Sequence, residues 1–171
     1  RNIYEIEIGK FKNAKNPNTE NFRQFPNSIK ELKLNKNDTI AMYCTGGIRC
    51  EKASSYLKNI GFKNIHQLEG GIINYLEYKK KSKKKSKWTG ECFVFDNRVT
   101  VNSKLKHGKY IQCYACRSPI SAADAKLKSY TKGISCKYCI DTISTKKKKS
   151  LVDRQRQIEL NHKRNDLHLF K

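Results

Sequence analysis

Short apolar runs alternate with amphipathic segments along the first half of the chain. Residues 40–44 form a continuous apolar run with the length of a buried strand. Residues 51–60 repeat apolar side chains at the spacing of one helix face, and Gly61 follows as a stop. A second short strand is expected at 65–68 and another helix at 72–78. Strands that alternate with helices predict a parallel α/β sheet with flanking helices.

The rest of the pattern is less regular. Pro26 begins a predicted helix that runs to Leu34, and residues 91–101 are expected to form a hairpin that turns at 96–97. The stretch 113–139 is typical of a loop, and 151–162 predicts a charged helix. We therefore expect a small cysteine-rich region and a C-terminal helix to follow the sheet.

A lysine run separates two parts of different character. Residues 79–87 read KKKSKKKSK, with seven lysines in nine residues. We expect an α/β domain at 1–82, a lysine-rich linker at 83–87, and a cysteine-rich region with a terminal helix at 88–171. Only 37% of the 171 residues are hydrophobic, so the predicted core is thin.

The chain is strongly basic, with a formal net charge of +22. Such a charge favours a polyanionic partner, because lysines that contact phosphates release bound counterions. A second lysine block lies at 146–149, and both blocks are equally compatible with solvated linkers. The candidate RNA-binding residues are the lysines of the first run: Lys79, Lys80, Lys81, Lys83, Lys84, Lys85 and Lys87.

The chain shows no run long and apolar enough for a membrane span and no secretory signal at its start, so we expect no membrane partner. It begins at Arg1 without a methionine, and we expect it to lack an N-terminal part. Its seven cysteines include two C-x2-C pairs. An odd count without a signal segment favours reduced thiols in the cytoplasm over a disulfide scaffold.

The most informative segment is 43–50, which reads YCTGGIRC between a predicted strand and a predicted helix. Two glycines let such a loop curl so that backbone N–H groups point inward, where the start of the helix adds its positive dipole end. Cys44 would lie at the centre of this anion-binding loop, with Arg49 as a positive charge at its rim. The alternative is an ordinary strand–helix turn with a buried cysteine. The residues expected to line the loop are Thr45, Gly46, Gly47 and Ile48.

Cys50 follows at the start of the same helix. It is a candidate for resolving an oxidised or persulfidated Cys44 as a disulfide. The alternative, a small side chain packed in the first helical turn, is favoured somewhat more.

A second cysteine cluster is predicted to hold zinc. Cys113 and Cys116 are separated by nineteen residues from Cys136 and Cys139, which is the spacing of a site with four thiolate ligands. Four ligands leave no open position, so the metal would be structural. Redox-active pairs or free thiols are the alternatives. His66, His107 and Cys92 are expected to be ordinary surface or packing residues.

The loop from Cys44 to Arg49 resembles the active-site loop of the rhodanese domain, in the six-residue form typical of sulfurtransferases. Related phosphatases use one residue more. Glu5, with the following GKF and Ala14, resembles the stretch after that domain's first strand, and LEGG at 68–71 resembles its double-glycine turn. The opening strand of the domain is missing, which agrees with a truncated start.

Further strings extend the resemblance over nearly the whole chain. YCTGGIRCEKAS, LEGGIINY, GECFVFDNRV and the two cysteine pairs together are similar to the bacterial tRNA uridine hydroxylases (TrhO), which carry a rhodanese domain. The resemblance implies that molecular oxygen is a co-substrate and that the wobble uridine of certain tRNAs becomes 5-hydroxyuridine. It also implies that Cys44 is the catalytic cysteine, able to carry a persulfide, and that the full-length chain has an N-terminal domain.

The residues alone indicate a nucleophilic thiol on a basic chain and leave the reaction open. No non-haem iron pattern and no organic cofactor site is evident. A rhodanese-type sulfurtransferase, which passes persulfide sulfur from Cys44 to a small-molecule, protein or tRNA acceptor, fits the loop equally well. It does not need the cysteine-rich region. A non-catalytic zinc-containing RNA-binding module is disfavoured by the intact Cys44 loop.

Overall fold

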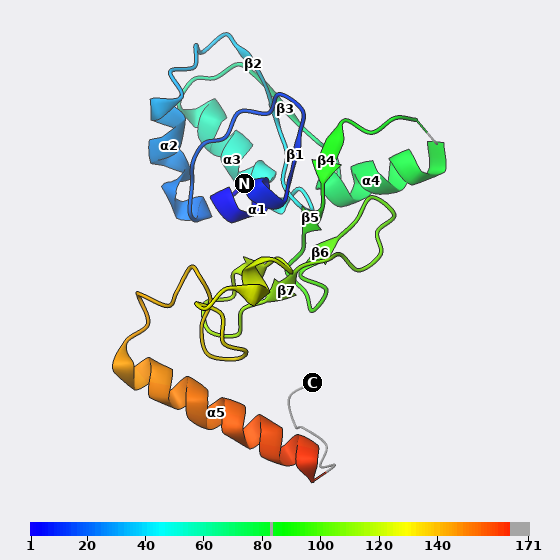
Figure 1. Ribbon diagram of the computed structural model, residues 1–171. Coiled ribbons are helices and arrows are strands. Elements are labelled where there is room, and N and C mark those ends of the chain that lie inside the picture. Colours follow the sequence, from blue (N-terminus) through cyan, green and yellow to red (C-terminus); the bar gives the residue numbers. More distant parts are fainter. Residues whose placement is uncertain (83, 165–171) are drawn as a thin grey trace. The chain divides into compact units, whose positions relative to one another are not determined.

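The computed structural model describes residues 1–82 and 84–164 as a mixed α/β protein. The chain divides into two compact units, Arg1–Gly108 and Lys109–Lys171 (Figure 1). This division differs from the predicted boundary at the lysine run. The reason is that β4 (Trp88–Gly90) pairs antiparallel with β1 (Gly9–Phe11), which ties the segment after the run to the first unit.

The parallel sheet of the first unit contains β2 (Thr39–Met42) and β3 (Asn64–Gln67), in register from Thr39 opposite Asn64. The helix α3 (Ile48–Asn59) forms the crossover between them. These are the two strands that the apolar runs predict, and within the described residues they make up the whole of the parallel sheet. The other strands form separate antiparallel pairs.

Two helices cover the β2–β3 pair. Ile29 of α2 (Phe25–Glu31) and Leu57 of α3 form a buried cluster with Phe62, and side chains of both strands pack against it. The structure confirms the stop at Gly61, which has a φ of +93° that favours glycine. The α2 helix ends at Glu31, before the expected Leu34, because Lys33 adopts a left-handed φ of 47°.

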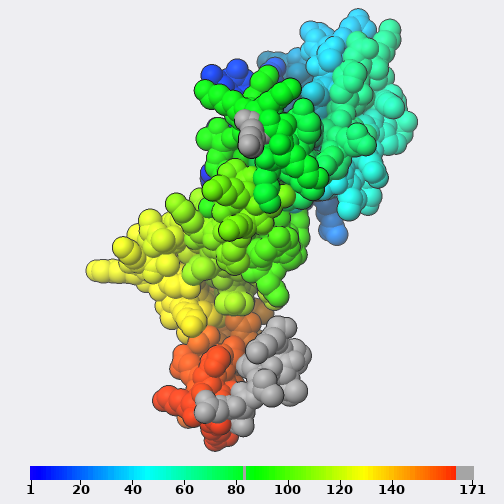
Figure 2. Space-filling model, turned by 90° about the vertical axis from the view of Figure 1, so that its right-hand side faces the viewer, coloured from blue at the N-terminus to red at the C-terminus, as the bar shows by residue number. Residues whose placement is uncertain are grey.

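A second cluster lies between α4 (Gly71–Ser82) and the antiparallel strands. Ile72, Leu76, Trp88 and Val101 are among its buried members. The predicted hairpin is confirmed, with β5 (Cys92–Phe93) antiparallel to β6 (Thr100–Val101). In the space-filling view of Figure 2, the green part of the chain, which contains α4 and β4, lies at the surface of the first unit.

Aromatic contacts fix Tyr43, the residue that precedes Cys44. The ring of Phe11 in β1 makes edge-to-face contacts at centroid distances of 4.8 Å to Tyr43, 4.8 Å to Tyr75 and 5.1 Å to Trp88. The loop after β2 is therefore held by both β4 and α4.

The helix α1 (Ile3–Ile8) was not predicted. Its signal in the sequence is the spacing of Asn2 and Glu5, which is that of a helix-capping pair. The backbone N–H of Asn2 donates a hydrogen bond of 2.9 Å to the carboxylate of Glu5. This short helix brings a buried carboxylate into the first unit.

The second unit has little regular structure apart from its helix. It contains the antiparallel pair β7 (Ile111–Gln112) and β8 (Pro119–Ile120), a 3-10 turn, η2 (Asp124–Lys126), and α5 (Thr145–Lys163). The α5 helix begins before the expected residue 151 because the Ser144 side chain caps it, accepting a hydrogen bond from the backbone N–H of Lys147.

No helix among the described residues is long and apolar enough to cross a membrane.

Candidate functional site

The Cys44 loop connects β2 to α3. Its thiol group is buried, with the residue 4% exposed, and the Gly47 backbone N–H donates a hydrogen bond of 3.1 Å to Cys44 Sγ. Gly47 has a φ of +95°, which turns the chain into the helix at a cost that only glycine avoids. Backbone N–H groups and the helix start therefore surround the sulfur with positive partial charge.

The start of α4, just after the turn at Gly70 and Gly71, is hydrogen-bonded to the Cys44 loop. The N–H of Ile72 donates to the Cys44 carbonyl at 3.0 Å, and the N–H of Ile73 donates to the Thr45 carbonyl at 3.2 Å. A Cβ atom at Gly71 would come within 2.5 Å of both carbonyl oxygens. Glycine at position 71 is thus required for this close approach.

The electrostatic environment separates the two thiols of the site. The hydrogen bond from the Cys50 thiol lowers the pKa of Cys44 to about 5, with help from the N–H groups of Cys50, Arg49 and Gly47 and against the effect of burial. The same hydrogen bond raises the pKa of Cys50 far above its ordinary value. Cys44 is therefore a thiolate at neutral pH, while Cys50 stays protonated beside it.

Arg49 is held by a carboxylate that the sequence did not single out for this role. Its two terminal nitrogens donate hydrogen bonds of 2.6 and 2.8 Å to the two oxygens of Glu5. The Arg1 guanidinium lies 3.2 Å from the same carboxylate. The Glu5 side chain is fully buried. Burial raises the pKa of Glu5, but the hydrogen bonds and charges of Arg49 and Arg1 outweigh it and hold the pKa below its ordinary value. Two arginines against one carboxylate leave this group with a net positive charge.

The outer side of the loop is tied to β5. The Thr45 hydroxyl donates to the Phe93 carbonyl at 3.0 Å, and Arg49 lies within 3.4 Å of the Thr45 oxygen. Cys92 is fully buried, and burial raises its pKa, which agrees with the expected packing role. Phe95, beyond the end of β5, is 68% exposed.

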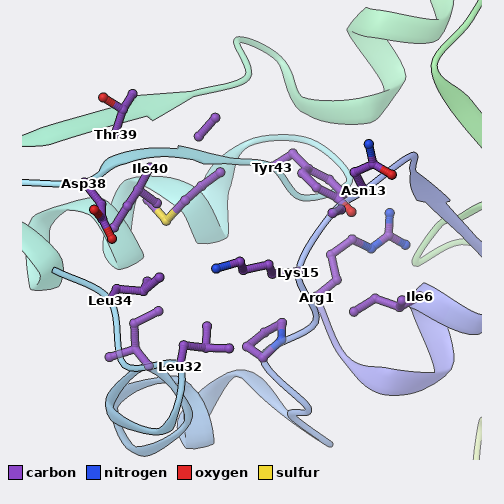
Figure 3. A pocket seen from close by; sticks show the side chains of 15 residues that line it. Arg1, Ile6, Asn13, Lys15, Leu32, Leu34, Asp38, Thr39, Ile40 and Tyr43 are labelled. Atoms are coloured by element: carbon purple, nitrogen blue, oxygen red, sulfur yellow. The ribbon is translucent and has the colours of Figure 1, made fainter.

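Two cavities in this part of the first unit differ in whether Cys44 lines them. A cavity of about 50 Å³ borders Cys44, Arg49 and Cys50. It has room for a few water-sized groups and so for one extra sulfur atom on Cys44, but not for a pyrimidine base. A larger cavity of about 530 Å³ lies between β2 and the segment around Leu32, with Lys15 extending across it (Figure 3). The larger cavity is not lined by Cys44, so of these two cavities the smaller one adjoins the candidate thiol.

The part of the chain that carries this site is similar to a known protein family. Residues 1–78 match the family of the rhodanese-like domain. The chain contains a rhodanese-like domain. The match includes Glu5, the Cys44 loop and most of α4, and it ends before the lysine run.

The rhodanese-like domain is followed by the four cysteines of the second unit, whose sulfur atoms all lie within 4.8 Å of one another. The Sγ–Sγ distances are 4.0 Å for Cys113 and Cys139, 3.6 Å for Cys116 and Cys136, and 3.7 Å for Cys136 and Cys139. Tetrahedral zinc with Zn–S bonds of about 2.3 Å places its ligands about 3.8 Å apart. The cluster can therefore hold a metal ion such as zinc.

The charge balance of the cluster also suits a cation. Burial raises the pKa of Cys136 and raises the pKa of Cys139 to about 11. Four ionised sulfurs at these separations would repel one another strongly, and a bound dication removes that repulsion as the protons leave. Ile120 packs against the buried cysteines, so the metal would replace much of a conventional core.

The lysine run begins on the last turn of α4 and continues past its end. Lys80 and Lys81 are exposed, as are Lys84, Lys85 and Lys87 after the helix, whereas Lys79 is half-buried. Lys83 lies outside the described residues. Lys81 forms an ion pair of 2.9 Å with Glu77, one turn earlier in the same helix. The exposed lysines of the run can therefore be reached by a polyanion. His66 and His107 are both exposed.

Proposed function

We propose that this chain belongs to a tRNA-modifying enzyme that uses molecular oxygen to convert the wobble uridine of tRNA to 5-hydroxyuridine, with Cys44 as its catalytic, persulfide-capable cysteine. The observation that carries the thiol chemistry is the Cys44 loop, where backbone N–H groups and the Cys50 thiol lower the pKa of Cys44 to about 5. A rhodanese-like domain is consistent with rhodanese-type activity. The choice of tRNA rests on the family resemblance and is supported by the net charge of +22.

The proposed reaction needs two electrons. One atom of molecular oxygen enters the C–H bond of the base and the other becomes water, which takes up two electrons and two protons. Cys44, as a thiolate, and Cys50, as a thiol, supply the two electrons when they join in a disulfide, and this step releases the one proton of Cys50. The second proton comes from solvent. A thiol reductant of the cell would then restore the pair. We propose the reducing cytoplasm as the site of action for this reason.

Oxygen labelling tests the proposal. Purified protein, tRNA and a thiol reductant are incubated under heavy-isotope oxygen gas, and the nucleosides are analysed by mass spectrometry. We expect 5-hydroxyuridine that carries the heavy atom. Product labelled from heavy water instead, or no product with the full-length protein, contradicts the proposal.

A plain sulfurtransferase is the second candidate. The small cavity beside Cys44 has room for the outer sulfur of a persulfide, which extends the side chain by about 2 Å. Thiosulfate should then add the mass of one sulfur atom to the chain, and an acceptor such as cyanide should remove it. Sulfur transfer without any change in tRNA would favour this second function.

A further inference from the structure

Phe95 is a large aromatic side chain that lies exposed next to the reactive loop. It is 68% exposed, whereas its neighbours Phe93 and Val94 are buried, so the core does not require an aromatic ring at position 95. The loop itself exposes a second large apolar side chain, Ile48, at 71%. Water-facing apolar groups beside a reactive centre indicate a surface that contacts a ligand.

The ring of Phe95 is held in place from two sides. It lies edge-to-face against Phe93, with ring centroids 5.0 Å apart, and the Arg49 guanidinium lies 5.3 Å from its centroid. Phe93 is itself anchored through its carbonyl by the Thr45 hydroxyl at 3.0 Å. The position of Phe95 is therefore coupled to the same loop that carries Cys44.

The charged groups near Phe95 are paired with groups of opposite charge. Asp96 is the acidic neighbour, and Arg98 neutralises it with a short ion pair of 2.6 Å. Arg49 and Arg1 together balance the Glu5 carboxylate and the Cys44 thiolate. An approaching phosphate backbone thus meets no unpaired carboxylate among these residues.

We propose that Phe95, together with the Arg49 guanidinium, is a stacking platform for an unpaired pyrimidine base of RNA at the mouth of the Cys44 loop. This inference rests on the proposed function and names the surface that would hold its substrate. Unpaired RNA bases are recognised by stacking on aromatic rings and on arginine planes. The 50 Å³ cavity at Cys44 is too small for a base, so the base must rest outside the loop, where Phe95 and Ile48 are exposed.

Binding of RNA hairpins by Phe95 variants of the full chain tests the platform. The probe is an anticodon stem-loop with uridine at the wobble position, and the control probe has an abasic site there. Phe95→Ala should weaken binding of the uridine probe about tenfold or more, since stacking on one aromatic ring contributes on that scale. Phe95→Tyr keeps the π-face and should bind like the parent. Phe95→Leu is the matched control, because it keeps the apolar bulk and should behave like Phe95→Ala.

The abasic probe shows whether the base is what Phe95 contacts. The parent should bind it as weakly as Phe95→Ala binds the uridine probe, and the two decreases in affinity should not add. Equal affinity of Phe95→Ala and the parent for the uridine probe, or full additivity of the two decreases, overturns the platform.

Two further measurements separate the platform from the proposed function and from misfolding. The ultraviolet titration of the Cys44 thiolate should be unchanged in Phe95→Ala, which shows that the loop is intact. Weakened binding in Phe95→Ala with no 5-hydroxyuridine formed by the parent would leave the platform standing and contradict the reaction. Failure of the parent to bind either probe contradicts both.

Discussion

The buried carboxylate of Glu5 positions Arg49 of the Cys44 loop. Each of its carboxylate oxygens accepts a hydrogen bond from Arg49, and one of them also accepts from the backbone N–H of Asn2. A fully buried carboxylate is stable only because these partners compensate for its missing hydration. Arg49 in turn is kept at a fixed place beside Cys44 instead of moving freely in solvent.

Removing this charge should destabilise the first unit. Glu5→Gln keeps the shape of the side chain but leaves Arg49 and Arg1 without a counter-charge. We expect the free energy of unfolding to fall by about 3 kcal/mol, as for other broken buried pairs. Urea denaturation measures it, and Glu7→Gln, an exposed position in the same helix, is the control. Equal stability of the two variants would contradict this role for Glu5.

Cys50 sets the ionisation of Cys44. Cys50→Ala removes the donor that lowers the pKa of Cys44 most, so this pKa should rise from about 5 toward 9. In a plot of thiolate absorbance against pH, the midpoint of Cys50→Ala should lie at a higher pH than the midpoint of the parent. Cys50→Ser retains a donor and should shift the midpoint less. The signal is assigned by its disappearance in Cys44→Ser, and a midpoint that does not move in Cys50→Ala contradicts this role.

At the scale of elements, the sequence predicted what depends on local pattern. The strand before Cys44, the α3 helix, the glycine stop and the hairpin of β5 and β6 all follow from apolar spacing and turn residues. The pairing of β1 with β4 could not be predicted this way, because it joins segments far apart in the chain through backbone hydrogen bonds.

The candidate site, like the elements, could be predicted only where its residues are close together in the sequence. The Cys44 loop could be recognised because its glycines, cysteine and arginine are adjacent in the sequence. Glu5 and Phe95 reach the loop only through the tertiary fold, and neither carries a local signal of that contact. The four metal-ligating candidates were recognisable from the spacing of their pairs.

The lysine run should act as a phosphate-binding element. Replacing Lys80, Lys81, Lys84 and Lys85 with glutamine should weaken tRNA binding for all sequences alike. The log–log salt slope should fall by about 0.7–0.9 for each phosphate that the variant no longer neutralises. Titration of tRNA binding at several salt concentrations measures this slope.

A matched set of exposed lysines controls for overall charge. The control variant carries glutamine at Lys30, Lys33, Lys58 and Lys63, all exposed in the first unit. It removes the same charge and should change the slope less. Equal slopes in the parent and both variants would mean that the run is a solvated linker.

At the scale of the whole molecule, the two units depend on different interactions. The first has apolar clusters around Leu57 and Leu76. The described apolar core of the second is built largely around Cys113, Cys136 and Cys139. A domain with so little apolar core commonly needs a metal to fold.

Zinc should therefore co-purify at about one ion per chain, as one four-cysteine site requires. A strong chelator should speed amide hydrogen exchange in 109–164 and leave 1–82 unchanged, and Cys136→Ser should do the same without chelator. Protein purified under reducing conditions with no bound metal would contradict the site.

The central claim, that Cys44 is the catalytic thiol of a tRNA-modifying enzyme, is tested most directly by nucleoside mass spectrometry of tRNA. Cells that lack the full-length gene are supplied with the parent gene or with its Cys44→Ser variant. We expect 5-hydroxyuridine to return with the parent and to stay absent with the variant at equal protein level, because a serine hydroxyl cannot form the anion that this loop stabilises. Full restoration of 5-hydroxyuridine by Cys44→Ser, or none by the parent, would contradict the claim.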